Sequence, residues 1–159
     1  MRAAWSPRGA QAVVVISGRN AWRVVHGALN ATTGEVVRMV TTTSKTADVV
    51  GAVAALGAVR PEVPKLLIWD NAPSHQPKAV RVAAEAAGIE LAFLPFRAPE
   101  LMPLEDLWRG LKGEVAANRA DATMEELAER ALAALDAPSR DERRRRAGLT
   151  SSKFHWLPT

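Results

Sequence analysis

The sequence predicts a single α/β or α+β domain built on a mixed β-sheet. Its first third reads as short, β-branched strands, and the remainder alternates helical and strand-like segments before it ends in helices. A chain of 159 residues with 48% hydrophobic and 24% charged residues suits one domain, which we place at residues 1–159. Antiparallel strands near the beginning and helix-linked strands later together make the expected sheet mixed.

Composition narrows the classes of protein. The chain contains no cysteine, which excludes disulfides and thiolate metal sites and fits the cytoplasm. No apolar run approaches the roughly 20 residues of a membrane span, and no signal-peptide core is visible, so we expect no membrane partner. Lys plus Arg number 21 against 17 for Asp plus Glu, a net charge of +4. That balance is compatible with a polyanionic partner, and equally with ordinary solvated surface charges.

The first segments are expected to be strands. Residues 12–16 form an unbroken apolar run before the turn Ser17-Gly18, and residues 22–29 alternate enough to form a second strand. Residues 30–34 are rich in turn formers, and residues 35–42 are β-branched. Strands joined by short polar loops predict an antiparallel meander.

The period then changes to that of a helix. Ser44 or Thr46 can cap a helix through residues 48–56, and residues 60–64 break it with two prolines. Residues 65–69 read as a short buried strand.

The next unit repeats the order of helix and strand. Residues 77–87 form a helix with proline in its first turn and Gly88 just past its end. Residues 89–94 form a second buried strand, and residues 95–99 form a proline-bounded loop. Pro103 then opens a helix, and Thr123 with Glu126 makes a capping box for another that runs to about Leu135. The apolar face of the helix from Pro103 consists of Leu104, Leu107, Trp108, Leu111 and Val115.

Asp70 ends the apolar strand at residues 65–69. In open sheets, functional sites lie at the carboxyl ends of parallel strands, and Asp70 stands at such an end. Glu105, on the helix from Pro103, lies about 100° around the helix from Leu104, at the margin of the apolar face. It aligns with Trp108 and Lys112, so its side chain can point toward a strand end and stay in water.

Two carboxylates that converge on a strand end can hold Mg²⁺, which prefers oxygen ligands. Two such ions about 4 Å apart can activate a nucleophile and stabilise the leaving oxygen of a phosphodiester. The alternative is structural: an Asp-Asn pair at a strand end is often a turn or helix cap, and Glu105 in a first helical turn suits the helix dipole.

Beyond these two residues, a long stretch of the sequence resembles a known family. The segments "LLIWDNAPSHQPKAV" and "GIELAFLPFRAPELMPLEDLWRGLK" closely resemble the catalytic domain of DDE-superfamily endonucleases, the transposases of bacterial insertion sequences related to mariner-type elements. The segments "RAAWSPRGAQAVV", "NRADATMEEL" and "GLTSSKFHWL" resemble other parts of that domain, so the likeness covers essentially the whole chain.

The resemblance implies a ribonuclease-H-like fold, a mixed sheet flanked by helices. It also implies cleavage and joining of DNA at transposon ends, with Mg²⁺ or Mn²⁺ as cofactor and a location in the cytoplasm, associated with the nucleoid. It places the second family acid on Asp70 and the third on Glu105, as catalytic residues and metal ligands. Asn71 and His75 match motif positions beside the site, with a supporting or DNA-contacting role. For His75, a purely structural hydrogen bond to the loop is an equal alternative.

Three features depart from the family pattern. The first family Asp lies on a strand shortly before the tryptophan-proline segment, and this sequence starts after that point, so the first strand is expected to be missing. Before Asp70 the sequence holds only three acids, none of which looks placed to substitute. Met102 stands where the family usually has Asn, and no helix-turn-helix region precedes the domain. The three acids are Glu35, Asp48 and Glu62.

These departures predict impaired two-metal catalysis and an unpaired sheet edge that invites association. Arg109 and Lys112, close to Glu105 on one helix, are the best candidates for contacting the DNA backbone, whereas Trp108 is expected in the core. The run 143–146 of four arginines can grip phosphates or can be the solvated end of a helix.

Three hypotheses follow. The first is a shortened transposase catalytic domain of the two-metal type. The second is a non-catalytic remnant that binds DNA, or pairs with a full-length transposase or with its own copies. The third is a decayed reading frame.

Overall fold

The structure, a computed structural model, describes residues 22–115, 123–155 and 157. The strand expected at residues 12–16 and the tryptophan-proline segment before it lie outside the described residues. No helix within the described ranges is both long and apolar enough to cross a membrane.

The chain first forms a β-hairpin. Strands β1 (Val24–Leu29) and β2 (Val36–Thr41) pair antiparallel, with Leu29 opposite Val36. In the turn, the Asn30 side chain accepts backbone N–H groups at 2.8 and 2.9 Å, and Gly34 adopts a φ of 71°. The two strands expected in this part of the sequence are confirmed, each slightly shorter than predicted.

A parallel pair of strands follows. Helix α1 (Thr46–Ala58) leads to β3 (Lys65–Trp69), and α2 (Lys78–Ala86) carries the chain over to β4 (Ile89–Phe93), which pairs with β3 in parallel. Gly88 ends α2 with a φ of 65°. Between β3 and α2 lies a short 3₁₀ turn, η1 (Pro73–His75). A buried cluster unites these elements: Val49, Val53, Trp69, Val80, Ala84 and Ile89.

The C-terminal part is helical. After η2 (Pro99–Leu101), helix α3 (Pro103–Val115) begins at the predicted proline, and α4 (Met124–Asp136) begins at its predicted cap, Thr123, whose side chain accepts the Glu126 N–H. A further helix, α5 (Arg140–Arg146), and a turn, η3 (Ser152–Phe154), follow. The second buried cluster lies here and contains Leu107, Leu135 and Ala147, with Leu29 and Val36 of the hairpin packed against it.

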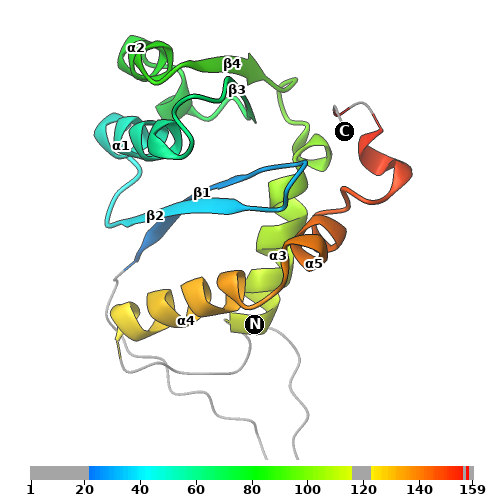
Figure 1. Cartoon of the computed structure of the whole chain (residues 1–159). Helices are drawn as coiled ribbons and strands as arrows, with labels where there is room; N and C mark the ends of the chain where they lie inside the picture. Colours follow the sequence, from blue (N-terminus) through cyan, green and yellow to red (C-terminus); the bar gives the residue numbers. More distant parts are fainter. Residues whose placement is uncertain (1–21, 116–122, 156, 158–159) are drawn as a thin grey trace, which may run out of the picture.

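The strands belong to two separate sheets. Among the described residues, β1 hydrogen-bonds only with β2, and β3 only with β4. Figure 1 shows the β3–β4 pair with α1 and α2 on one side of the molecule, the hairpin in the middle, and α4 on the other side, while α3 crosses the hairpin near its turn. The predicted α/β class with both antiparallel and parallel pairs is confirmed. The single continuous sheet is not formed by these residues.

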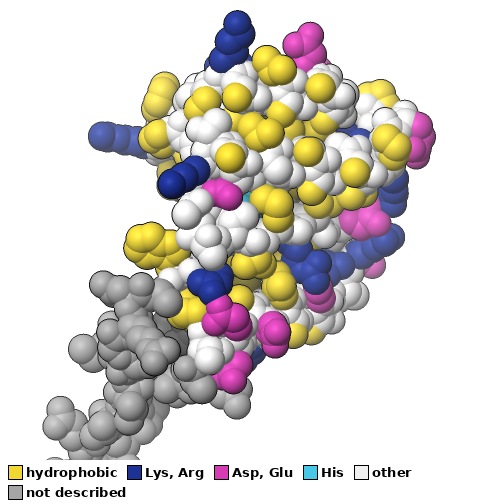
Figure 2. All heavy atoms as spheres, turned by 90° about the vertical axis from the view of Figure 1, so that its left-hand side faces the viewer, with side chains coloured by type: hydrophobic (Ala, Val, Ile, Leu, Met, Phe, Trp, Pro, Cys, Tyr) yellow, Lys and Arg dark blue, Asp and Glu magenta, His cyan; other side chains and the backbone are white. Residues whose placement is uncertain are grey.

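The surface reflects the two halves. On the face drawn in Figure 2, hydrophobic side chains gather over α1 and α2, and the lower part of the face carries interspersed acidic and basic groups. Exposed apolar residues of the upper half include Val59, Val63, Leu66 and Val82.

Candidate functional site

Asp70 lies at the carboxyl end of β3, as predicted. Its side chain is 62% exposed, and its Oδ1 accepts the backbone N–H of Ala72 at 3.0 Å. The Nδ1 of His75 lies 2.8 Å from the same Oδ1 and 3.4 Å from the backbone carbonyl oxygen of Asp70. These bonds orient the carboxylate from one side, and no bond from the described residues reaches its other oxygen. The carboxylate thus combines a structural role in the turn with an oxygen that remains accessible.

His75 is fixed by an aromatic contact as well. Its ring stacks on the indole of Trp69, with centroids 4.4 Å apart and planes within 5°. Because Trp69 is buried in the cluster beneath β3, the stack anchors the imidazole beside Asp70. His75 Nδ1 also makes the expected hydrogen-bond contact with the loop, at 3.4 Å from the carbonyl oxygen of Asp70. The stack gives a reason for an aromatic ring at both Trp69 and His75.

Asn71 turns away from open solvent. Its Nδ2 donates to the carbonyl of Leu94, just past β4, and its Oδ1 accepts the side-chain amide of Gln76 at 3.1 Å. The residue therefore ties the end of β3 to the end of β4. Both ends of the Asn71 amide are thus engaged by protein groups.

Glu105 occupies the first turn of α3. Its side chain is exposed, and its carboxylate has no hydrogen bond or ion pair within the part of the chain that the structure describes. Its backbone N–H donates to Met102, whose side chain packs against the cluster that contains Trp69. Met102 thus connects the start of α3 to that cluster.

Asp106, next to Glu105 in the sequence, differs from it because its carboxylate forms ion pairs. Asp106 pairs with Arg109 at 2.8 Å and with Lys153 of η3. Arg109 nonetheless keeps 74% of its side chain exposed, and Lys112, one turn further along α3, is exposed too. Glu105, Arg109 and Lys112 follow one another at helical spacing, so they line one side of α3.

Asp70 and Glu105 open onto the same cavity, which has a volume of about 870 Å³. All residues of β1 and β3 line it, together with apolar residues of α1 and the first turn of α3. We call this cavity the β1–β3 groove. His75 also lines it, whereas Asn71, Arg109 and Lys112 do not.

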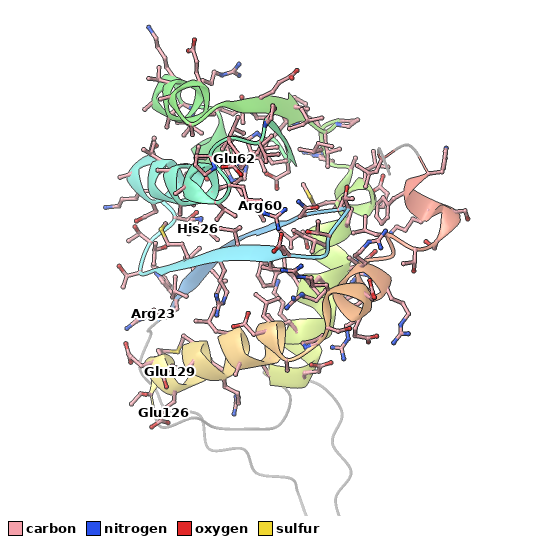
Figure 3. All side chains as sticks on the ribbon, in the orientation of Figure 1. Arg23, His26, Arg60, Glu62, Glu126 and Glu129 are labelled. Atoms are coloured by element: carbon pink, nitrogen blue, oxygen red, sulfur yellow. The ribbon has the colours of Figure 1, made fainter. Side chains whose placement is uncertain are left out.

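The three acids before Asp70 have other places in the fold. Glu35 pairs with Arg60 at 2.8 Å and with Arg140. Asp48 accepts the Thr43 hydroxyl and the Lys45 backbone N–H, and these hydrogen bonds lower its pKa below the ordinary value. Figure 3 shows Glu62 on the segment before β3. Glu35 lines the groove near Arg60, whereas Asp48 and Glu62 do not line it.

The arginine run belongs to α5 and is engaged by the protein. Arg143 donates to the carbonyls of Gly34 and Leu135, and Arg144 donates to that of Ala31. The other two pair with acids: Arg145 with Glu142, and Arg146 with Glu142 and Glu114. The hydrogen bond from Arg146 lowers the pKa of Glu142, and the same bond raises the pKa of Arg146.

The structure also shows features that the sequence reasoning missed. The Trp69–His75 stack joins a strand to a turn and has no periodic signal. In the proline-bounded loop, Phe96 is 80% exposed and Arg97 adopts a positive φ of 57°. Trp108, as expected, packs inward, where its ring lies against Gly27 of β1.

Asp70 at the carboxyl end of β3 and Glu105 in the first turn of α3 thus line one groove of an α/β scaffold. Comparison with protein families then identifies the family: the model of the DDE superfamily endonucleases matches residues 1–128, and the chain belongs to this family. No curated protein matches the chain.

Solved structures support the fold. The catalytic domain of Mos1 mariner transposase superposes with a TM-score of 0.63 at 21% identity, over 77% of this chain and 67% of that one. The Mos1 strand transfer complex gives a TM-score of 0.72 at 17% identity, over 98% of this chain and 47% of that one. The Mos1 paired end complex with Mn gives 0.66 at 18% identity, over 98% and 48%.

The likeness confirms the predicted ribonuclease-H-like α/β fold. The chain spans about half the length of the two Mos1 chains in these complexes.

Proposed function

We propose that this chain carries a transposase-type catalytic site that cleaves and joins DNA by metal-assisted phosphoryl transfer, with Asp70 and Glu105 as its metal ligands. The single observation that carries the proposal is that Asp70, just after β3, and Glu105, in the first turn of α3, both line the β1–β3 groove. Family membership supports the reaction class.

The donor set fits a hard cation. Asp70 offers an oxygen without a protein hydrogen bond, and Glu105 offers its whole carboxylate, so both ligands are oxygens of the kind that Mg²⁺ and Mn²⁺ accept. A divalent ion bound there would activate the attacking oxygen and stabilise the leaving oxygen of a phosphodiester. His75 orients Asp70 by its hydrogen bond, and Arg109 and Lys112 would attract the DNA backbone along α3.

Among the described residues, two carboxylates are proposed for the site. Within the described ranges, no group of three or more His, Asp or Glu side chains is placed to hold a metal ion. A two-ion mechanism needs ligands for both ions, so we expect the chain alone to turn over DNA slowly or not at all. One observation favours the binding function as a second candidate: the exposed basic side of α3 does not depend on a third acid.

A nicking assay tests catalysis. Supercoiled and linear DNA carrying transposon ends are incubated with the chain and Mg²⁺ or Mn²⁺, beside Asp70→Asn and Glu105→Gln. We expect background turnover from all three and weakened Mn²⁺ binding, by calorimetry, in both variants. Robust turnover that Asp70→Asn abolishes would overturn the expected impairment, and unchanged Mn²⁺ binding in both variants would overturn the assigned ligands.

Gel shifts over a salt series test binding. If Lys112 contacts a phosphate, Lys112→Gln should weaken binding to all sequences and reduce the salt slope by about 1. Lys78→Gln on α2 is the matched control, because Lys78 is equally exposed on a helix that does not line the groove. Absence of retardation at low salt would remove the binding function.

Location and assembly follow from the same proposal. A DNA-cleaving protein of this family works where the DNA is, so we place it in the cytoplasm with the nucleoid. Its assembly partners would be copies of itself or an intact transposase on paired DNA ends. Sedimentation with and without DNA measures the assembly.

A further inference from the structure

The loop between β4 and η2 carries an aromatic ring at the surface. Phe96 is 80% exposed, the largest exposed fraction among the large hydrophobic side chains that the structure describes. Within the same residues its ring contacts neither an aromatic ring nor a cation, whereas Phe93, at the end of β4, packs on Trp69 and lies under Arg81. Single exposed apolar residues are common, so the backbone around Phe96 must show whether the ring has a task.

The loop holds this ring in a fixed place. At its start, the Leu94 N–H donates to the carbonyl of Trp69 at 2.9 Å, and the Leu94 carbonyl accepts the side-chain amide of Asn71. At its end, the loop passes directly into the hydrogen-bonded turn η2. Prolines on both sides of Phe96 restrict the backbone between these points. The ring is therefore presented to solvent by a short, constrained segment.

Arg97, the next residue, has a strained backbone. Its φ is 57°, in the left-handed region that bulky side chains rarely adopt. One other described residue that is not glycine, Arg60, has a positive φ, and its ion pair with Glu35 and its carbonyl, which accepts Lys65 Nζ, hold it in place. The Arg97 side chain is exposed and has no hydrogen bond or ion pair within the described ranges. Strain of this kind clusters at ligand-binding positions.

The loop lies at the end of the sheet that carries Asp70. Strands β3 and β4 are parallel, so their carboxyl ends face the same way, and the segment after β4 passes this end on its way to α3 (Figure 1). The Cα of Phe96 lies at most about 7 Å from that of Leu94, which bonds to the residue before Asp70. Further along the chain, Glu105 follows in the first turn of α3. The ring thus belongs to the segment that connects the two proposed metal ligands.

An exposed ring beside an exposed guanidinium suits an unpaired nucleobase and its phosphate. Stacking on a side chain needs an open face of the base, and a base inside a duplex offers none because its neighbours cover both faces. The guanidinium of Arg97 supplies hydrogen-bond donors for phosphate oxygens. Arg109 and Lys112 on α3 offer charge without a ring, which suits the backbone of any DNA.

We propose that Phe96 stacks on an unpaired DNA base beside the strand held at Asp70 and Glu105, and that Arg97 binds an adjacent phosphate. This inference rests on the proposed function, because it requires DNA at this end of the sheet. It adds the form of the substrate, which is DNA with a locally unpaired base rather than a continuous duplex.

Binding to three DNA probes of one sequence tests the inference: a paired duplex, the same duplex with one extra unpaired thymine, and a single strand. The full chain is titrated into each labelled probe without divalent cations, so that neither cleavage nor the assigned metal ligands influence the result, and anisotropy gives Kd. The variants are Phe96→Ala, Phe96→Leu and Phe96→Trp. Val82→Ala is the matched control, because Val82 is 53% exposed on α2. A probe with iodouracil as the unpaired base cross-links on irradiation and locates the contact.

The parent chain should bind the probe with the unpaired thymine about tenfold more tightly than the paired duplex. Phe96→Ala and Phe96→Leu should lower this ratio to about 1, since leucine keeps apolar bulk but has no π-face, whereas Phe96→Trp and Val82→Ala should retain it. Arg97→Gln should weaken binding to the unpaired probe and reduce its salt slope by about 1. The iodouracil cross-link should map to Phe96 and disappear in Phe96→Ala.

Several results would overturn the inference. An unchanged ratio in Phe96→Ala would exclude the contact, and an unchanged ratio in Phe96→Leu would assign it to apolar bulk rather than stacking. A parent dimer that Phe96→Ala dissociates in the absence of DNA would place the ring against a second copy of the chain. A fall in Tm shared by the variants would place it in the core. Each of these outcomes leaves the proposed function intact if the chain binds DNA, whereas no binding to any probe at low salt would overturn both.

Discussion

Three residues near Asp70, namely Ala72, His75 and Trp69, together fix the position of its carboxylate. The Ala72 N–H donates to Oδ1, the His75 Nδ1 lies 2.8 Å from it, and the Trp69 stack holds the ring in place. A ligand whose rotamer is fixed in advance loses less conformational entropy when a cation binds. In the proposed site, the imidazole would thus position the Asp70 carboxylate.

Removal of the imidazole should therefore weaken metal binding without removing a ligand. We expect His75→Ala to lower the Mn²⁺ affinity of the chain about tenfold, in the range found for groups that orient metal ligands. Gln76→Ala is the control, because Gln76 bonds to Asn71 and makes no hydrogen bond to Asp70. Calorimetric titration of both variants measures the effect, and equal affinities would show that the hydrogen bond serves the turn alone.

The carboxylate of Asp48 makes the stability of the fold depend on pH. Hydrogen bonds from Thr43 and Lys45 hold its pKa below the usual value in the folded chain, so the unfolded chain binds the proton more readily. Its contribution to stability is complete above the unfolded-state pKa and is lost as the pH falls through the folded one. We expect Asp48→Asn to lower Tm at pH 7 and to match the parent chain near pH 2. Thermal melts across this range measure the difference, which should not grow toward acid pH.

Asp70 and Glu105 were predicted from the sequence because each sits at the boundary of an apolar pattern and matches a motif position of the family, and their role as metal ligands stays a prediction. The Trp69–His75 stack could not be predicted, since the contact depends on how η1 folds back over β3. For the arginine run 143–146, the sequence also allowed two roles, phosphate binding or the solvated end of a helix. The run in fact bonds to carbonyls of the distant hairpin turn, which no local pattern encodes.

At the scale of elements, helix α5 binds the turn between β1 and β2 through its arginine side chains. Arg143 and Arg144 donate to turn carbonyls, and Arg140 pairs with Glu35. The approach is close: a Cβ on Gly34 would lie 2.2 Å from the Arg140 carbonyl oxygen. The positive φ and the contact with α5 both require glycine there.

A comparison of Gly34 with Gly88 distinguishes the cost of backbone strain from the cost of a steric clash. Gly34 and Gly88 share a positive φ, but a Cβ on Gly88 would meet nothing within 4 Å. Gly88→Ala should cost about 1 kcal/mol from the left-handed backbone alone, and Gly34→Ala about 3 kcal/mol because α5 must also move. The corresponding falls in Tm are about 3 and 9 °C. Similar falls in Tm for both would show that α5 does not hold the turn.

Local end signals explain which elements could be predicted. Pro103, Thr123 and Gly88 mark helix ends through their own backbone chemistry, and the structure places helix ends at all three. Helix α5 was not predicted as a separate element, although Ser139 caps it by accepting the Glu142 N–H. The pairing of strands could be predicted only within each pair, and among the described residues no strand hydrogen bond joins the two pairs.

On the scale of the whole molecule, the chain has a divided core. One buried cluster lies among α1, α2, β3 and β4, and the other among α3, α4, α5 and the hairpin. No strand hydrogen bond joins the two halves within the described ranges, and α1 makes the main contacts across to the hairpin. The Arg60–Glu35 pair also spans them, but exposed ion pairs contribute only about 0–1 kcal/mol.

A divided core should open in two steps. We expect native-state hydrogen exchange with increasing denaturant to show two opening free energies, one shared by β3, β4 and α2, the other by β1, β2 and α3, since each unit keeps its own buried cluster when the other opens. Arg60→Gln should change neither value by more than about 1 kcal/mol. One common opening free energy would mean that the contacts of α1 with the hairpin couple the two halves into one cooperative unit.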